Sequence, residues 1–217
     1  MGEVGEVLSA FEEALQKAIP RLGEEGPLRE AMASALLSGG KRVRPVIVLI
    51  TAAAVGKGRN VLSAALAAEY FHTASLIADD LPSMDNAFTR RGASALHVRY
   101  GEATALLASY ALIAAGFDGI YAAAQEVDEW GEPFALAVKS AAESAGLEGA
   151  AGGQHLDLFG GDSSKLERLI YQKTVTLFES SFLFGWLFGG GDVAGIGGIR
   201  RAAYHFGMAY QVADDIE

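Results

Sequence analysis

The chain has 217 residues, half of them hydrophobic, and a formal net charge of −10. This composition excludes a disordered chain and argues against a general binder of nucleic acid or anionic membranes. The absence of cysteine excludes disulfides, thiolate metal sites and cysteine nucleophiles, and it fits a reducing compartment. Residues 1–20 carry acids where a signal peptide is basic, and no apolar run is long and continuous enough to span a bilayer. We therefore expect a cytoplasmic protein that forms one domain over residues 1–217.

Apolar residues recur at helical spacing through nearly the whole chain, and alternating strand patterns are absent. This pattern predicts an all-α fold. In chain order, the expected helices cover residues 4–18, 27–38, 44–55, 60–81, 94–99, 102–125, 132–148, 164–190 and 199–217. The segment Ala64–Ala78 is apolar around most of the helix circumference, which places its helix in the centre of a large bundle.

Two acidic pairs end apolar helical runs, one in SLIADDLP (Ser75–Pro82) and one in YQVADDIE (Tyr210–Glu217). Acids at a helix C-terminus are unfavourable, because the helix dipole is negative there. One such pair could simply be solvated, but two of them favour a shared cation. Asp85 joins the first pair if a bulge at Pro82 turns it back, since six residues are not a whole number of helical turns. The carboxylates available to a hard divalent cation are then Asp79, Asp80, Asp85, Asp214 and Asp215.

Two further polar positions accompany these acids. Gln211 precedes the second pair by about one helical turn, on the same side of the helix. Asp157, in GGQHLDL, lies one turn after Gln154 and is a further candidate ligand. Taken alone, Asp157 reads equally well as an ordinary polar residue at a helix edge.

Basic residues gather in the motifs GGKRVRP, TRRG and YQKT. Clustered arginine and lysine beside a helix N-terminus form a good diphosphate site, with arginine giving forked hydrogen bonds. One such run alone is usually solvated, but the combination favours binding. The candidates are Lys41, Arg42, Arg44, Arg90, Arg91 and Lys173. His72 lies two turns before Asp79 on a nearby face, so we expect it to contact substrate rather than serve only as a core histidine.

Together these motifs resemble a known family. GGKRVRP, FHTASLIADDLPSMDN with TRRG, GGQHLDL, KT and YQVADD occur in the order and approximate spacing of the trans-isoprenyl diphosphate synthases. From about Gly39 onward the chain looks similar to the geranylgeranyl and bacterial-type farnesyl synthases. The resemblance implies a helical isoprenoid-synthase fold around a central cavity. It also implies a homodimeric, magnesium-dependent prenyltransferase that joins isopentenyl diphosphate head to tail with an allylic diphosphate.

The resemblance also implies roles for individual residues. Three Mg2+ ions would be held by Asp79, Asp80, Asp85 and Asp214, with Asp157 in support and Asp215 as a further candidate. Isopentenyl diphosphate would be bound by Lys41, Arg44, His72 and Arg91. The allylic diphosphate would be bound by Arg90 and Lys173. The carbocation would be stabilised by Lys173, the main-chain carbonyl of Thr174, and Gln211.

Product length should depend on the helix that precedes Asp79. At 1.5 Å of rise per residue, Ala74 lies about 7 Å and Phe71 about 12 Å below Asp79. The family commonly shortens its product with a bulky side chain about five residues before the first aspartate. Ala74 occupies that position, with small Ser75 beside it, so the upper tunnel should be open. Closure lower down by Phe71 or Tyr70 would favour a geranylgeranyl product over a farnesyl one.

Three departures from the family pattern leave alternatives open. Residues 93–95 read Ala-Ser-Ala where Lys-Pro-Thr is usual, and residues 109–110 read Ser-Tyr where Gly-Asp is common. The chain stops at Glu217, where relatives continue with further helices, so we expect it to lack the C-terminal helices of the full fold. The alternatives are a non-catalytic partner subunit of a prenyl diphosphate synthase, a farnesyl diphosphate synthase, or a terpene cyclase. A cyclase has no need for a second diphosphate site, so Lys41, Arg44, His72 and Arg91 count against it.

Overall fold

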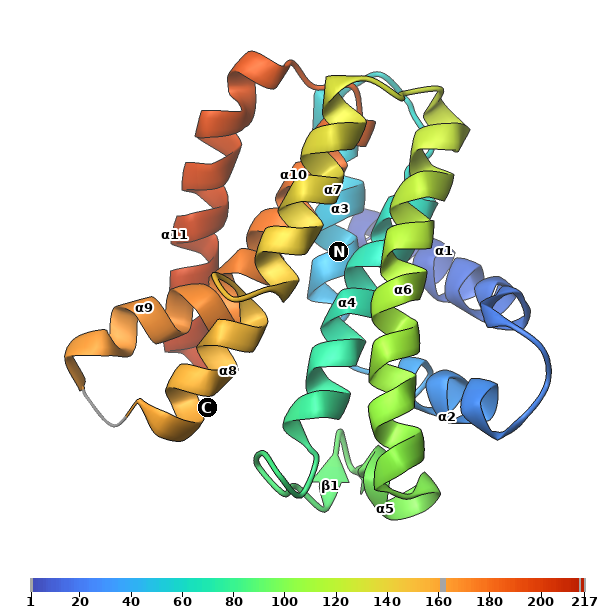
Figure 1. Cartoon of the computed structure of the whole chain (residues 1–217). Coiled ribbons are helices and arrows are strands. Elements are labelled where there is room, and N and C mark those ends of the chain that lie inside the picture. Colours follow the sequence, from blue (N-terminus) through green and yellow to red (C-terminus); the bar gives the residue numbers. More distant parts are fainter. Residues whose placement is uncertain (1, 161–162, 215, 217) are drawn as a thin grey trace.

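The computed structural model describes residues 2–160, 163–214 and 216. This part of the chain is predominantly helical, as the periodicity predicts, and its helices surround a central pair (Figure 1). The helices are α1 (Gly2–Ala18), α2 (Pro27–Leu36), α3 (Val43–Val55), α4 (Leu62–Asp79), α5 (Leu96–Tyr100), α6 (Glu102–Val127), α7 (Glu132–Ala145), α8 (Ala150–Phe159), α9 (Leu166–Ile170), α10 (Thr176–Phe188) and α11 (Ile196–Asp214). Short 3-10 turns cover Ile19–Leu22, Ser163–Lys165 and Val193–Gly195, and Tyr171–Val175 forms a π-helix, η3.

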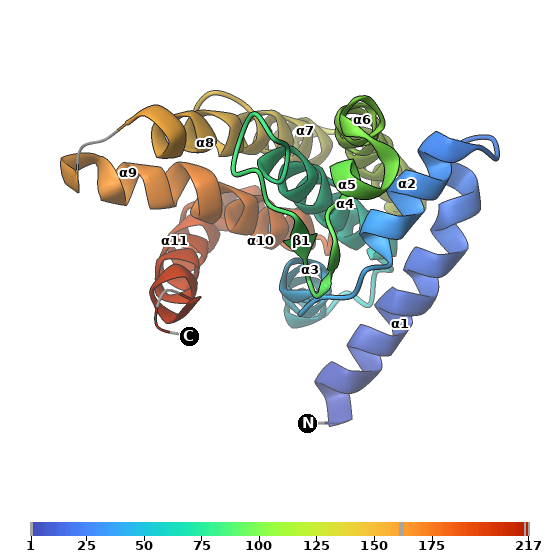
Figure 2. The same cartoon turned by 90° about the horizontal axis from the view of Figure 1, so that it is seen from below.

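Helix α4 lies at the centre of the bundle, as its apolar sequence predicts. It packs along α6 and also contacts α3 and α10 (Figures 1 and 2). Its buried positions include Ala64, Ala65, Ala67 and Ala68, whose small side chains let neighbouring helices approach closely. Larger buried residues, including Phe71 and Ile77, follow toward its C-terminal end. The helix therefore combines close packing in its first half with room for a site in its second half.

Helix α10 is the second central element, and most of its residues are buried. It contacts α3, α7 and α11 as well as α4. The rings of Phe178, Phe184 and Phe188 are inaccessible to solvent. A helix that is apolar on all sides in this way belongs inside a large bundle, because no face is suited to water.

Helix α6 is long and apolar enough to cross a membrane when judged by length and composition alone. The core helices of soluble proteins pass the same test, and within the described residues α6 is the one helix that does. One of its faces is buried, with Leu112 and Ile120 inaccessible. On the other face Leu107, Tyr110 and Tyr121 are exposed.

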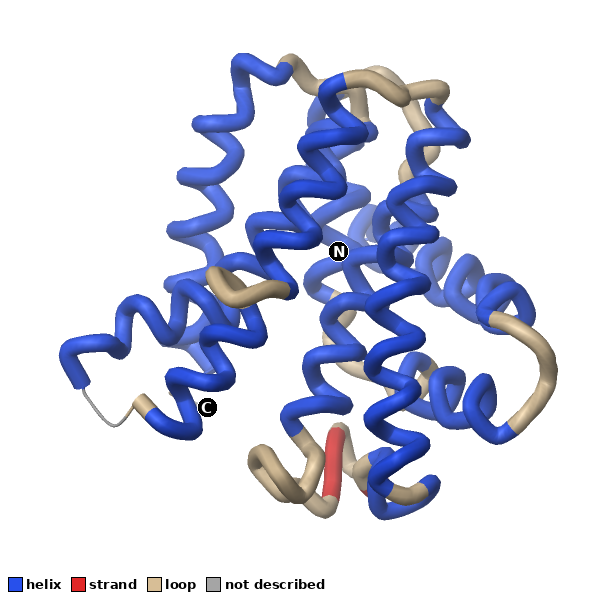
Figure 3. Tube along the Cα trace, viewed as in Figure 1, coloured by secondary structure: helices blue, strands red, loops and turns tan. Residues whose placement is uncertain are grey.

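Two local features depart from the predicted helices. The helix expected over 164–190 is divided into α9, η3 and α10, and α8 was not predicted as a separate helix. A short antiparallel hairpin, β1 (Thr89–Arg90) with β2 (Ala93–Ser94), also follows the first acidic motif, where no strand was expected. Figure 3 marks this hairpin region in red at the lower end of an otherwise helical trace.

The glycine pair Gly152–Gly153 explains why the sequence pattern does not predict α8. Adjacent glycines usually punctuate a helix. Here both are buried within α8, and a Cβ on Gly153 would lie 2.4 Å from the main-chain nitrogen of Lys173. Glycine is thus required because the backbones of α8 and η3 touch, and not because the helix ends.

We predict that Gly153→Ala lowers the free energy of unfolding by about 1–3 kcal/mol, because backbone must move to admit the methyl group. The matched control is Gly5→Ala in α1, where an added Cβ meets nothing within 4 Å. That change should be neutral or raise stability by up to about 1 kcal/mol. Guanidinium unfolding followed by circular dichroism measures both. Equal effects of the two changes would contradict the close contact between α8 and η3.

Candidate active site

The predicted motifs meet at one end of the bundle. The C-terminal ends of α4 and α11, the β1–β2 hairpin and α8 all lie toward the lower side in Figure 1. Two cavities open there, an apolar one of about 450 Å³ and a charged one of about 300 Å³. The C-terminal half of α4 contributes side chains to both cavities.

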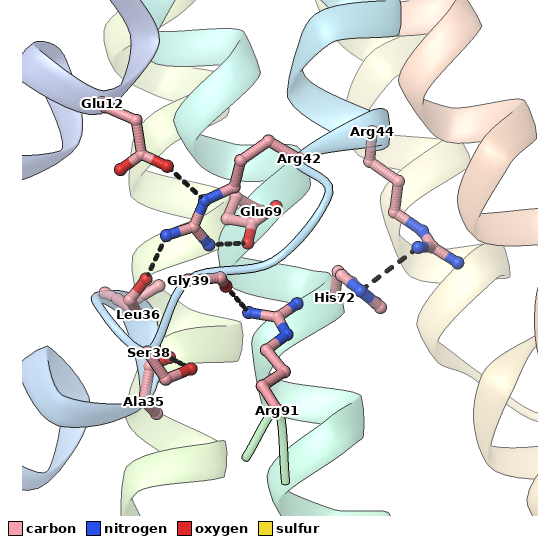
Figure 4. Close-up of polar contacts among 10 residues, drawn as sticks. All are labelled: Glu12, Ala35, Leu36, Ser38, Gly39, Arg42, Arg44, Glu69, His72 and Arg91. Atoms are coloured by element: carbon pink, nitrogen blue, oxygen red, sulfur yellow. Dashed lines mark hydrogen bonds and ion pairs between the residues drawn. The ribbon is translucent and has the colours of Figure 1, made fainter. Parts of the chain in front are cut away.

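The charged cavity collects most of the predicted basic residues. Its lining includes Lys41, Arg42, Arg44, His72, Arg90 and Arg91, together with Glu69, Tyr210 and Asp214. Nη1 of Arg44 lies 3.2 Å from Nε2 of His72. The guanidinium carbon of Arg44 lies 4.3 Å from the centroid of the Phe178 ring. Arg91 donates a hydrogen bond to the carbonyl of Gly39 (Figure 4). The four residues predicted for isopentenyl diphosphate are therefore brought together.

The electrostatics of this cavity favour an anion. Burial lowers the pKa of Arg44 to about 10, with nearby Arg91 acting in the same direction and Glu69 opposing it. Burial and the charge of Arg44 hold the pKa of His72 well below its ordinary value, so the imidazole is neutral at pH 7. Among the described residues, Nε of Arg44 and Nδ1 of His72 are buried without a hydrogen-bond partner. A bound anion would relieve the mutual repulsion of the arginines.

Arg42 behaves differently from its neighbours, and its contacts argue against the predicted direct role in substrate binding. Its side chain is 1 % exposed. Nε donates to Glu12 at 2.7 Å, Nη1 to Glu69 at 2.5 Å, and Nη2 to the carbonyl of Leu36 at 2.7 Å (Figure 4). All three nitrogens are thus engaged within the protein.

Glu69 is a site residue that the sequence analysis missed. It is the one carboxylate in the apolar segment Ala64–Ala78, and its side chain is 1 % exposed. A charge that is buried in this way needs a partner, so an isolated acid on an apolar helix face is the signal that could have identified it.

The first acidic motif folds as its spacing suggested. The main-chain N–H of Asp85 donates to the carbonyl of Asp79 at 2.9 Å, so the chain turns back after Pro82. The buried carboxylate of Asp80 forms an ion pair with Arg90, whose Nε lies 3.0 Å from Oδ1. Oδ1 of Asp85 accepts a hydrogen bond from Nε2 of Gln154 at 3.1 Å.

The carboxyl group of Asp79 has a raised pKa. Burial raises its pKa to about 6, and the charges of Asp85 and Asp80 add to the rise, whereas Lys173 and Arg90 oppose it. The position therefore favours a nearby cation.

The described residues contain no preformed group of three acids or histidines around one metal position. Asp214 is exposed and lines the charged cavity, and Asp215 lies outside the described residues. Oε1 of Gln154 is buried without a partner in the described part of the chain. Carboxylate and amide oxygens beside open space fit Mg2+, which usually takes one or two carboxylates and completes its shell with water and phosphate.

The π-helix η3 carries Lys173 and Thr174, and the third predicted catalytic residue, Gln211, lies on α11. Lys173 Nζ contacts Oδ2 of Asp157 at 2.5 Å, and Oγ1 of Thr174 donates to Oε1 of Gln211 at 2.8 Å. A π-turn inserts one extra residue into a helix and is frequent at functional sites. Here it joins α8 and α11 through two consecutive side chains, so Lys173, Asp157, Thr174 and Gln211 form one connected group.

The apolar cavity follows α4 away from Asp79. Its wall includes Phe71, Ala74, Ser75 and Ala78 from α4, together with residues of α6 and α8. Ser109, one of the departures from the family pattern, lines the cavity and donates to the carbonyl of Ala74 at 2.9 Å. Ala74 and Ser75 thus border the open space of the cavity.

Phe71 is the aromatic residue that α4 contributes to this cavity. Its ring lies against Gly116, where a Cβ would be 2.6 Å from Cζ, and packs edge-on to Phe117 with centroids 5.2 Å apart. Tyr70 lines a separate groove between α1, α4 and α6. Of the two aromatic residues considered for closing the tunnel, Phe71 is therefore the one in position.

Comparisons with known proteins agree with this arrangement. The chain is 39% identical over 211 residues to the heterodimeric geranylgeranyl pyrophosphate synthase large subunit 2 of Arabidopsis thaliana, covering 94% of this chain and 55% of that protein. It is 39% identical to the farnesyl diphosphate synthase of Geobacillus stearothermophilus, covering 98% of this chain and 73% of that protein. The structure superimposes with a TM-score of 0.88 on a geranyltransferase from Legionella pneumophila at 27% identity, covering 99% of this chain and 78% of that one.

The chain thus spans little more than half the length of the plant relative and about three quarters of the bacterial one. Inside the helical bundle, a cationic cavity thus lies beside an apolar cavity that begins at Asp79. The chain belongs to the polyprenyl synthetase family, whose model matches residues 26–217.

Proposed function

We propose that this chain is a Mg2+-dependent trans-prenyltransferase that condenses isopentenyl diphosphate with an allylic diphosphate. The observation that carries the proposal is the adjacency of the two cavities along α4. One gathers Lys41, Arg44, His72 and Arg91, and the other leads from Asp79 into apolar space. Two substrates that each have a diphosphate and a hydrocarbon part match this pair of environments.

The cationic residues would hold the two diphosphates apart. Lys41, Arg44 and Arg91 bind that of isopentenyl diphosphate, and neutral His72 hydrogen-bonds to it. Arg90 and Lys173 contact the allylic diphosphate, for which their partners Asp80 and Asp157 already orient them. When bound, Mg2+ supplies neutralisation of the departing diphosphate, and the residues that would hold it are Asp79, Asp80, Asp85 and Asp214, with Asp157 in support.

The remaining residues would protect the carbocation. Lys173, the main-chain carbonyl of Thr174, and Gln211 lie together around η3, where oriented dipoles stabilise developing positive charge. The apolar wall formed by Phe71, Ala74 and its neighbours keeps water away from the cation and receives the hydrocarbon chain.

The charged cavity favours this function over the alternatives. A terpene cyclase needs no second diphosphate site, yet this cavity measures about 300 Å³ and is rich in arginine. A non-catalytic partner subunit has no need for both cavities. Residues 93–95 depart from the family pattern, yet Ala93 and Ser94 form the paired strand β2, and the Ala95 N–H donates to the Phe88 carbonyl at 2.9 Å.

We further propose a homodimer and a cytoplasmic location. Support for the homodimer comes from the exposed apolar face of α6, where Leu107, Tyr110 and Tyr121 gather. Contiguous exposed apolar patches commonly mark protein–protein contacts. The preferred product in this proposal is geranylgeranyl diphosphate, because Ala74 and Ser75 leave the cavity open above Phe71.

The first prediction is that Mg2+ is required and that the two acidic motifs act as one unit. Asp79→Ala and Asp214→Ala should each reduce turnover by about a hundredfold or more, and the double variant should be little worse than either. Glu24→Ala, at an exposed acid that lines neither cavity, is the control and should retain activity. Turnover that persists in EDTA would remove this mechanism.

A second prediction separates the two diphosphate sites. Arg44→Ala should raise the Michaelis constant for isopentenyl diphosphate by about tenfold or more, with a much smaller change for the allylic substrate. Lys173→Ala should mainly raise the Michaelis constant for the allylic substrate. The Lys173 side chain extends from η3 to Asp157 and does not line the charged cavity. Steady-state kinetics with each substrate varied in turn measures this. Equal losses for both substrates in both variants would show that the assignment is wrong.

Product length provides a third prediction. Ala74→Phe places a ring in the apolar cavity and should shift the product from geranylgeranyl toward farnesyl diphosphate or shorter. Ala137→Val, at a buried alanine of α7 outside the cavity lining, tests whether core overpacking alone has this effect. Chromatography of dephosphorylated products gives the chain length. An unchanged product from Ala74→Phe would mean that the growing chain does not pass this residue.

A further inference from the structure

The loop between α2 and α3 carries Lys41 to the charged cavity, Arg44 follows in the first turn of α3, and Arg42 lies between them at the end of the loop. Arg42 has a left-handed backbone conformation, with φ of 48°. Residues other than glycine adopt this conformation at a cost, so it persists where surrounding contacts hold it. At Arg42 those contacts come from its own side chain.

The Arg42 guanidinium connects three helices. It reaches Glu12 on α1, Glu69 on α4 and the carbonyl of Leu36 at the end of α2 (Figure 4). The planar fork of arginine can make these contacts at once, whereas a lysine ammonium would not span them. The side chain therefore fixes the loop from inside, while Lys41 and Arg44 on either side belong to the cavity wall.

Glu69 is the buried end of this connection. It lies one turn before His72 on α4 and also borders the charged cavity. Burial raises the pKa of Glu69, and the charges of Arg42, Arg91 and Arg44 oppose that rise. Its carboxylate thus lies within the electrostatic reach of three arginines at once and offsets part of their mutual repulsion.

Resting on the proposed function, we propose that Arg42 and Glu69 are positioning residues for isopentenyl diphosphate, which they do not touch. Arg42 ties the loop to α1, α2 and α4, so that Lys41 and Arg44 are held at the charged cavity. Glu69 anchors Arg42 and allows the cationic cluster to remain assembled before the diphosphate arrives. Residues that orient a binding group from behind affect affinity even without contacting the ligand.

The experiment measures binding of isopentenyl diphosphate and of geranyl diphosphate with Mg2+ to the whole chain by isothermal titration calorimetry. Arg42→Lys and Glu69→Gln should each weaken isopentenyl diphosphate by about tenfold and leave geranyl diphosphate within about twofold. The double variant should be little worse than either, because the two residues form one unit. If Arg42 instead served as a charge for the diphosphate, Arg42→Lys would retain affinity.

The matched control is Arg59→Lys. Arg59 is half-buried and likewise joins a carboxylate, Glu129, and a main-chain carbonyl, that of Phe188. This variant should lose stability without changing the ratio of the two affinities. Should Glu69→Gln fail to fold, the pair Arg42→Met with Glu69→Leu removes both charges at similar volume, a replacement that buried ion pairs often tolerate. That variant should fold, and its affinity for isopentenyl diphosphate should be reduced as in the single variants.

The outcomes separate this inference from the proposed function. Unchanged isopentenyl diphosphate affinity in folded Arg42→Lys and Glu69→Gln would overturn the positioning role. Parallel loss of both substrates would also overturn it, since it would indicate a general effect on folding. Absence of isopentenyl diphosphate binding by the unaltered chain would instead reject the proposed function.

Discussion

Helix α4 belongs to both cavities, and its packing against α6, α3 and α10 fixes their relative position. Its alanines permit close contact in the first half, and Glu69, His72 and Asp79 follow one another along one side of the helix. Because a single helix lines both cavities, α4 fixes the spacing between the charged cavity and the apolar one. The loop before α3, which carries Lys41, and the β1–β2 hairpin, which carries Arg90 and Arg91, complete the charged cavity by packing near α4.

Charge is compensated locally within a chain whose overall charge opposes its proposed ligands. The net charge is −10, yet the charged cavity concentrates arginines. Asp80 pairs with Arg90, Asp157 with Lys173, and Glu69 with Arg42. Each pair keeps a cation oriented, and the pairs of Asp80 and Glu69 also avoid an unpaired buried charge. The negative remainder of the surface contributes solubility and does not assist long-range attraction of diphosphates.

Much of the fold followed from periodicity, since long apolar helices such as α4 and α10 carry a strong signal. The turn that returns Asp85 toward Asp79 was also predictable from Pro82. Helix α8 was not, because the requirement for glycine at Gly153 comes from a contact with Lys173, twenty residues away in sequence. The contacts of the Arg42 side chain could not be predicted for a related reason. A motif gives the charge of a residue but not the direction of its side chain, and Glu12 and Glu69 are far from it in sequence.

The π-turn over Tyr171–Val175 has a consequence for how this chain tolerates insertions and deletions. One residue corresponds to about 100° of helical rotation, so removing a single residue here would regularise the helix while turning α9 against α10 by that angle. Lys173 and Thr174 would then lose their simultaneous access to α8 and α11. The number of residues in this segment is therefore constrained as strictly as their identity. In an exposed loop, by contrast, the loop can change its conformation to accommodate an added or lost residue. Changes of length among related chains should accumulate on either side of this turn and avoid it.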